Sequence, residues 1–419
     1  MTFAAWVRNK ADTLASWTER VTHVDVRRFA KDLSWLYSGQ VVGIATALLL
    51  AIGYSHFLTK ETYGTYKYVL AIFGVLTVFS LPGMSDAAQR AVAQGKEGVF
   101  WKTFRKRVEW GTVGGLVSAG IGFYYFTGGN TLLAAVFLAA SPFIVCIDAF
   151  TQYNALLMGR QMFRESSLYN AAVQIIASIV IFLAVLLSRN LIVLIVAYLS
   201  AFVFARLAVL LHVANRHPLN KTHDKDAISY GAHISINSII SLAVNQLDSI
   251  LLWHFLGPVA LAVYAFAEAA ADQAQKAFKL VTTSMAFPKF SATDKELLKK
   301  TLPRKILLSF SATIPLALAL VCIIPFVYGL LFPQYTESIP YAQVMALILL
   351  LMPIRFFSTA IAAKAPMRMI YTSNIVGAVS QAVLLFVFIP LYGIWGAILG
   401  TFLSQIITSF LNVYLFYHM

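Results

Sequence analysis

Residues 306–331 read ILLSFSATIPLALALVCIIPFVYGLL, a run of 26 residues without a charged side chain. A helix needs about 20 residues to cross the ~30 Å of hydrocarbon in a bilayer, so this run is predicted to span a membrane. The whole chain has the same character, because 59% of its 419 residues are hydrophobic and 12% are charged. Soluble domains carry roughly 25% charged residues, so an aqueous fold is excluded.

Eleven further windows outside this run are long and apolar enough to cross a bilayer. The twelve predicted spans lie near 33–57, 68–90, 109–127, 131–157, 168–188, 190–213, 232–256, 259–287, 305–331, 340–363, 369–389 and 393–417. The expected fold class is therefore an all-α polytopic membrane protein with about twelve transmembrane helices.

The basic residues predict the orientation, because short loops rich in Lys and Arg stay in the cytoplasm. If the N-terminus is inside, 25 of the 32 Lys and Arg residues fall in cytoplasmic segments. The outer loops hold only Lys60, Lys67 and Arg189. Both termini are therefore predicted to be cytoplasmic. The net charge of +14 is explained by topology, and no nucleic-acid partner is needed.

A polar stretch at 215–230 divides the spans into two groups of six and is predicted to be a cytoplasmic linker. It separates an N-lobe at 32–214 from a C-lobe at 231–419. Residues 56–58 and 254–256 both read HFL, at the ends of the first and seventh spans. A match between segments six spans apart favours parallel repeats around a central cavity, although a chance match is the alternative.

Residues 1–31 lack the continuous apolar stretch of a signal peptide and mix apolar with basic residues. We expect an amphipathic helix on the inner leaflet, with a flexible basic leader as the alternative.

One predicted span carries an unusual number of polar side chains. Five positions of the eighth span share an arc of about 100° on a helix: Glu268, Asp272, Gln275, Lys276 and Lys279. Each central charge costs roughly 2.5 to 3.5 kcal/mol on insertion, whereas a Leu or Phe returns only about 0.3 to 0.6. This stripe is therefore predicted to line a wet cavity or to meet partners.

Counting ~1.5 Å per residue from the outer loops sorts the intramembrane charges by depth. The carboxylates of Asp248 and Glu268 fall in the outer half, and Asp272 falls near the midplane. The cations fall in the inner half: Arg206, Lys276, Lys279 and Arg355.

The functional hypothesis is that these cations receive an anionic head group, since Arg and Lys bind phosphate oxygens. The carboxylates would then bind and release a coupling cation, H⁺ or Na⁺. The alternative is internal neutralisation, with Asp272 pairing with Lys276 on one helix and Asp148 or Asp86 pairing with Arg206.

Several classes of function have no support in the sequence. A phosphate-binding GxxxxGK[ST] loop, a nucleophile elbow and an HExxH motif are all absent. The His spacing matches no zinc site. Outer loops are too short to hold a catalytic domain. We therefore expect no enzyme, no cofactor and no metal.

Three segments resemble one family of membrane proteins. They are 57–89, with a Gly64-x-Tyr66 turn before Leu81-Pro82-Gly83, then 247–267, and 389–397, which reads IPLYGIWGA. These segments resemble the polysaccharide biosynthesis, or Wzx-type, flippases of the MOP superfamily, which also contains the MATE exporters. The two extra helices of the lipid II flippase branch are missing.

The resemblance implies two six-helix lobes in a V, alternating access and export of polyprenyl-diphosphate-linked oligosaccharide. It places a monomer in a bacterial or archaeal plasma membrane, in contact with glycan-assembly enzymes. Asp248 matches the family's acidic position in the seventh helix, and Lys276, Lys279 and Arg355 are counterparts of its cavity cations. The alternatives are a MATE-like H⁺ or Na⁺ antiporter of organic cations, a membrane glycan polymerase or ligase, and a non-transporting scaffold.

Overall fold

A computed structural model describes residues 26–222, 224, 226–282 and 286–419, and these residues form helices and short connections without a strand. In chain order the helices are α2 (Val26–Phe57), α3 (Lys60–Leu76), η1 (Thr77–Ser80), α4 (Gly83–Ala93), η2 (Glu97–Val99), α5 (Phe100–Thr127), α6 (Thr131–Ile147), η3 (Ala149–Gln152), α7 (Tyr153–Gly159), α8 (Phe163–Leu187), α9 (Leu191–Arg216), α10 (Ala227–Val244), α11 (Leu247–Val281), α12 (Phe287–Ala292), α13 (Lys295–Leu331), η5 (Pro333–Ser338), α14 (Ile339–Ala346), η6 (Leu347–Ile354), α15 (Arg355–Lys364), α16 (Met367–Tyr392) and α17 (Ile394–His418).

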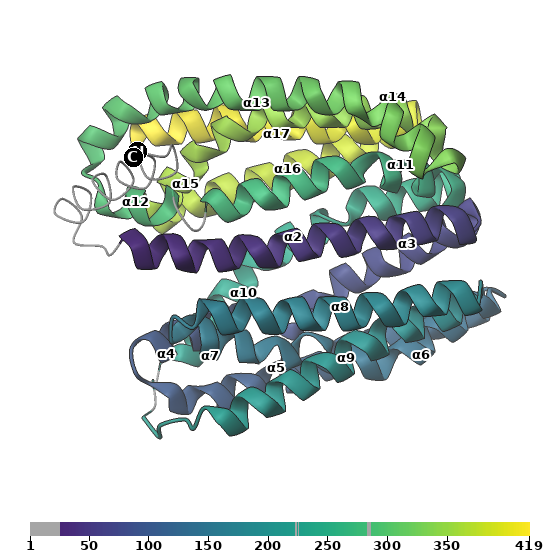
Figure 1. Cartoon of the computed structure of the whole chain (residues 1–419), viewed down its shortest axis with the longest axis horizontal. Helices are drawn as coiled ribbons and strands as arrows, with labels where there is room; N and C mark the ends of the chain where they lie inside the picture. Colours follow the sequence, from purple (N-terminus) through teal and green to yellow (C-terminus); the bar gives the residue numbers. More distant parts are fainter. Residues whose placement is uncertain (1–25, 223, 225, 283–285) are drawn as a thin grey trace, which may run out of the picture.

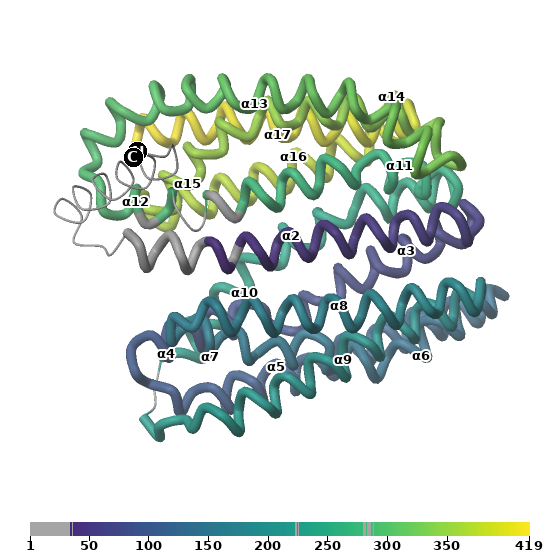
Figure 2. The backbone as a smooth tube through the Cα atoms, viewed as in Figure 1, coloured from purple at the N-terminus to yellow at the C-terminus, as the bar shows by residue number. Residues whose placement is uncertain are grey.

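The helices form two groups that run lengthwise beside each other (Figure 1). We call α2–α9 the N-lobe and α10–α17 the C-lobe, and we call the end where α2 meets α3 the outer end. Helix α2 packs along α8, whereas α3 packs along α11 and α4 along α10, so α3 and α4 join the lobes. Helix α10 carries the chain between the two groups (Figure 2).

Nine helices in the described part of the chain are long and apolar enough to cross a membrane, and the bent pair α3–α4 makes ten. One of the nine, Ala227–Lys279, has 53 residues and therefore exceeds the length of a single crossing. The predicted all-α polytopic membrane fold is confirmed.

The seventh and eighth predicted spans, near 232–256 and 259–287, are separated by a break at Gly257, and the structure adds an interruption within the seventh span. Helix α10 ends at Val244, and α11 runs from Leu247 to Val281 across a break at Gly257. Gly257 has φ 83° and ψ −179°, a backbone conformation that a residue with a Cβ rarely adopts. The seventh span therefore consists of α10 and the first part of α11, and the eighth span begins at Pro258.

The predicted turn at Gly64-x-Tyr66 and the outer loop at 58–67 are wrong. Helix α3 begins at Lys60, after the N-cap Thr59, whose side chain accepts a hydrogen bond from the Thr62 N–H. Gly64 therefore lies inside α3. A Cβ at this position would overlap the carbonyl oxygen of Pro258, so glycine allows α3 and α11 to approach closely. Lys67 is also a helical residue.

Two predicted boundaries also shift. Residues 1–25 of the predicted amphipathic segment lie outside the described residues, and α2 runs from Val26 into the first span without a break at residue 31. The connection between α9 and α10 begins after Arg216 and ends before Ala227, which is shorter than the predicted linker at 215–230.

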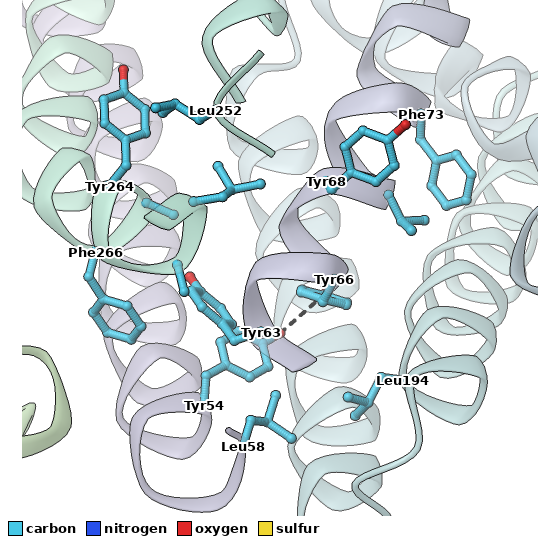
Figure 3. Packing of buried hydrophobic residues seen from close by; sticks show 14 of the residues in the cluster. Tyr54, Leu58, Tyr63, Tyr66, Tyr68, Phe73, Leu194, Leu252, Tyr264 and Phe266 are labelled. Carbon is cyan, nitrogen blue, oxygen red and sulfur yellow. Dashed lines mark hydrogen bonds between the residues drawn. The ribbon is translucent and has the colours of Figure 1, made fainter. Parts of the chain in front are cut away.

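Aromatic side chains fill the outer end between the lobes. Tyr63 of α3 lies 5.0 Å from the ring of Phe266 on α11, which stacks on Tyr335 of η5 at 3.7 Å. Within the N-lobe, the hydroxyl oxygens of Tyr54 and Tyr66 are 3.3 Å apart (Figure 3). This buried cluster closes the outer end of the interface between the lobes.

Candidate functional site

The inner half of α11 presents the predicted polar stripe. The Lys276 ammonium lies 2.6 Å from Asp272 Oδ2, and the two side chains are 55% and 42% exposed. Their spacing of four residues places them on the same helix face. Because charged side chains are costly to place against lipid, we expect this exposed face of α11 to meet water.

Helix α15 adds a second cation to the stripe. Arg355 donates a hydrogen bond from Nη2 to Gln275 Oε1 at 3.0 Å. Gln275 lies one residue before Lys276, so the structure brings Asp272, Gln275, Lys276 and Arg355 together. Lys279 lies exposed one turn further toward the inner end of α11.

Asp248, in the first part of α11, is enclosed by the protein, in contrast to the exposed stripe. Its side chain is buried and accepts hydrogen bonds from Tyr264 Oη at 2.7 Å and from the Ser249 N–H at 2.6 Å. The turn at Gly257 places Asp248 and Tyr264 side by side, because they lie almost equally far from it in the two halves of α11. Glu268 follows one turn after Tyr264 and is half-buried.

Lys67 lies near this outer group, although its predicted position in a loop gave no sign of it. It is a half-buried residue of α3, which packs along α11, the helix that carries Asp248 and Glu268. Because α3 belongs to the N-lobe, the cation and the two carboxylates come from helices on opposite sides of the lobe interface.

Arg206 does not join the stripe. It lies on α9, where Nη1 donates to the Ile147 carbonyl oxygen at 2.7 Å and lies 3.9 Å from Asp148 Oδ1. Arg206 and Asp148 both line a cavity of about 170 Å³ inside the N-lobe, between α3, α6 and α9. The guanidinium also lies over the ring of Phe202, 5.0 Å from its centroid.

Arg107 is a second buried cation of the N-lobe, which the sequence placed among the cytoplasmic basic residues. It is 3% exposed and donates from Nε to the Ser80 carbonyl oxygen at 3.3 Å. Its Nη1 donates to Thr151 at 3.3 Å and to Gln152 Oε1 at 3.1 Å. No pattern in the sequence distinguishes Arg107 from its exposed neighbours at the start of α5.

The outer ends of the lobes are sealed above the stripe. Gly64 of α3 lies against Pro258, and Tyr68 stacks on Trp253 with ring centroids 4.0 Å apart. An ion pair between Lys60 and Glu337 joins α3 to η5 at the rim. In the part of the chain that the structure describes, no group of three or more His, Cys, Asp or Glu residues could hold a metal ion.

The described helices thus form two lobes, with an exposed charged stripe on α11 beneath a closed outer end. The sequence profile of the family described as polysaccharide biosynthesis protein matches residues 29–294. The chain belongs to this family. The predicted membership in the polysaccharide biosynthesis family is confirmed.

Solved structures with the same fold are distant in sequence. The lipid II flippase MurJ in an inward closed conformation has a TM-score of 0.70 at 14% identity, over 92% of this chain and 86% of that one. A multidrug resistance MATE transporter in an inward-facing conformation has a TM-score of 0.67 at 12% identity, over 90% and 94%. A MOP superfamily transporter from Pyrococcus furiosus, described as having a binding pocket of reverse polarity, has a TM-score of 0.58 at 14% identity, over 92% and 95%. No curated protein sequence matches the chain.

Proposed function

We propose that this protein is a flippase that moves a polyprenyl-diphosphate-linked oligosaccharide from the inner to the outer leaflet by alternating access. The observation that carries the proposal is the exposed Lys276 beside Arg355, on the inner part of the lobes beneath a closed outer end. Membership in the polysaccharide biosynthesis family supports a glycan as cargo.

The proposed head-group site consists of Lys276, Lys279 and Arg355. A diphosphate carries several charged oxygens, and Arg and Lys bind such oxygens through charge-assisted hydrogen bonds. Arg355 has a neutral partner, Gln275, so its charge is available to an anion. Arg206 leaves the proposed set, because its guanidinium already contacts Ile147 and Asp148 in the N-lobe.

The proposed coupling group consists of Asp248, Glu268 and Asp272, with H⁺ or Na⁺ as the ion. The proposed counter-charge of the first two carboxylates in the present state is Lys67 of the opposite lobe, on α3, which packs along α11. Separation of the outer ends of the lobes would withdraw Lys67 and leave these carboxylates to bind a cation from outside. This exchange links the opening of the outer end to ion binding.

The same charge pattern argues against a MATE-like exporter of organic cations, which is the second candidate because of its shared fold. A cationic solute would meet Lys276, Lys279 and Arg355. We further propose a monomer in the plasma membrane with both termini in the cytoplasm, in contact there with glycan-assembly enzymes.

The test is translocation of a fluorescent polyprenyl-diphosphate oligosaccharide in proteoliposomes, with and without imposed proton and sodium gradients. We expect protein-dependent flipping that is lost in the double variant Lys276→Ala, Arg355→Ala. The matched control, Lys300→Ala with Arg304→Ala, also removes one Lys and one Arg, from exposed positions near the inner end of α13. Full flipping by the first variant would exclude the proposed head-group site, and gradient-driven efflux of an organic cation without flipping would favour the exporter.

A further inference from the structure

The inner end of the N-lobe carries a hollow that the proposed transport path does not use. It has a volume of about 410 Å³ and lies between the start of α5 and the segment that follows α9. Its walls are formed by Gly98, Trp101, Ala214, Leu219, Asn220 and Lys221.

Hydrogen bonds hold these walls in place. Glu97 accepts two hydrogen bonds from Arg160, both at 2.7 Å, and a third from the Asn220 N–H at 3.0 Å. The Asn220 side chain accepts from the Glu97 N–H at 3.1 Å, and the Thr222 carbonyl oxygen accepts from the Gly98 N–H at 2.9 Å. The segment after α9 is therefore attached to the N-lobe, and the hollow is preorganised for a ligand.

The segments that line the hollow carry three exposed cations. Lys221 lines it, Lys102 is exposed beside Trp101, and Arg216 is exposed in the last turn of α9. Within the described residues, none of these three cations has a carboxylate within ion-pair distance. Glu97 and Asp224, the nearby acidic residues, are already in ion pairs with other cations.

The length of α9 predicts that the hollow lies at the depth of the lipid head groups. Helix α9 begins at the outer end with Leu191, and Ala214 follows about 35 Å along its axis. The hydrocarbon layer is about 30 Å thick, which places Ala214 a few Å beyond its inner edge. Trp101 is 46% exposed at this level, where amphipathic aromatic rings are favoured.

We propose that this hollow binds the phosphate head group of an anionic phospholipid from the inner leaflet. Lys221 and Lys102 pair with the phosphate, and the ring of Trp101 packs against the glycerol and the first acyl carbons. The negative surface of the inner leaflet concentrates such lipids near basic pockets between helices. The bound lipid anchors the segment between the lobes at a fixed depth, independently of the transported solute.

The first test is native mass spectrometry of the purified full-length protein with phosphatidylglycerol or phosphatidylcholine. We expect phosphatidylglycerol to bind more tightly, and Lys102→Gln with Lys221→Gln to weaken it by about fivefold per lysine. The matched control is Lys295→Gln with Lys300→Gln, two exposed lysines at the inner end of α13. Equal losses in both pairs would show a general surface attraction and overturn the site, as would equal affinities for the two lipids.

A second measurement locates the lipid. Phosphatidylglycerol brominated near its head group should quench the fluorescence of the wild type more than that of Trp101→Phe, whereas brominated phosphatidylcholine should give little difference between the two proteins. Equal quenching of both proteins by phosphatidylglycerol would place the lipid elsewhere. Displacement by soluble glycerol phosphate at the same concentration as the lipid would show that the hollow binds free anions, and would also overturn the proposal.

Discussion

Both lobes hold charged side chains between their helices, but the surroundings of these charges differ. In the N-lobe, Arg107 is almost completely buried and donates to three protein oxygens. In the C-lobe, Lys276 has a single ion-pair partner, Asp272, and more than half of its side chain is exposed. A buried charge is tolerated when protein groups satisfy it, whereas an exposed charge keeps its capacity for water or a ligand. The number of protein partners that a charged side chain has is therefore a better sign of function than its presence in the helical bundle.

The largest effect on stability is expected in the N-lobe, where protein groups bind the buried guanidinium of Arg107. Arg107→Leu removes the donor to Ser80 and Gln152 and leaves buried acceptors unpaired. We expect it to lower the free energy of unfolding by about 3 kcal/mol, measured by thermal unfolding in detergent. Lys106→Leu, which removes only a partly exposed ion pair with Glu109, should cost less than about 1 kcal/mol. Equal stability of the two variants would remove the distinction between the lobes.

A smaller effect is expected at the enclosed carboxylate of the C-lobe. Tyr264→Phe removes the hydroxyl that donates to buried Asp248. We expect a loss of about 1.5 kcal/mol in the free energy of unfolding, because a hydrogen bond to a charged group is lost. The loss should shrink when saturating Na⁺ or lower pH supplies another partner for the carboxylate. An unchanged loss under all conditions would argue against a cation at Asp248.

For the exposed Lys276 of the C-lobe, a substitution should reduce transport without a matching loss of stability. Lys276→Gln should change the free energy of unfolding by less than about 1 kcal/mol, since an exposed ion pair contributes little. Flipping in proteoliposomes should nevertheless fall by about tenfold, which corresponds to one charge-assisted hydrogen bond of about 1.5 kcal/mol. If flipping and stability fall together, the stripe is structural like the N-lobe cluster.

The smallest effect is expected for the ion pair between Arg160 and Glu97 at the inner end of the N-lobe. Hydrogen bonds from Arg160 hold the pKa of Glu97 below its ordinary value. The corresponding stabilisation is present above the ordinary Glu pKa of about 4.3 and is lost as the pH falls through the lower pKa of the folded protein. Glu97→Gln should therefore be about 1 kcal/mol less stable than the wild type at neutral pH and should approach it near pH 3. A constant difference across this range would show that the charge of Glu97 is not the stabilising group.

Much of the fold followed from hydrophobicity, because a span of about 20 apolar residues has few alternatives in a bilayer. The exposed stripe was also predictable, since its polar residues recur at the three- and four-residue spacing of one helix face. The helical position of Lys67 was not, because it depends on Gly64 of α3 meeting Pro258 of α11, a contact between residues far apart in the chain. Arg107 was missed for a related reason. Its burial depends on η1 and η3 closing around the start of α5, which no local pattern reveals.

The close contact between Gly64 and Pro258 makes α11 a lever. Lys276 lies 18 residues beyond Pro258, or about 27 Å along the helix axis. If the lobes rotate about this contact by about 10°, the charged stripe swings by about 5 Å while the contact itself hardly moves. That displacement exceeds the reach of a hydrogen bond, so a small rocking motion at the outer end is enough to release a phosphate held by Lys276 and Arg355.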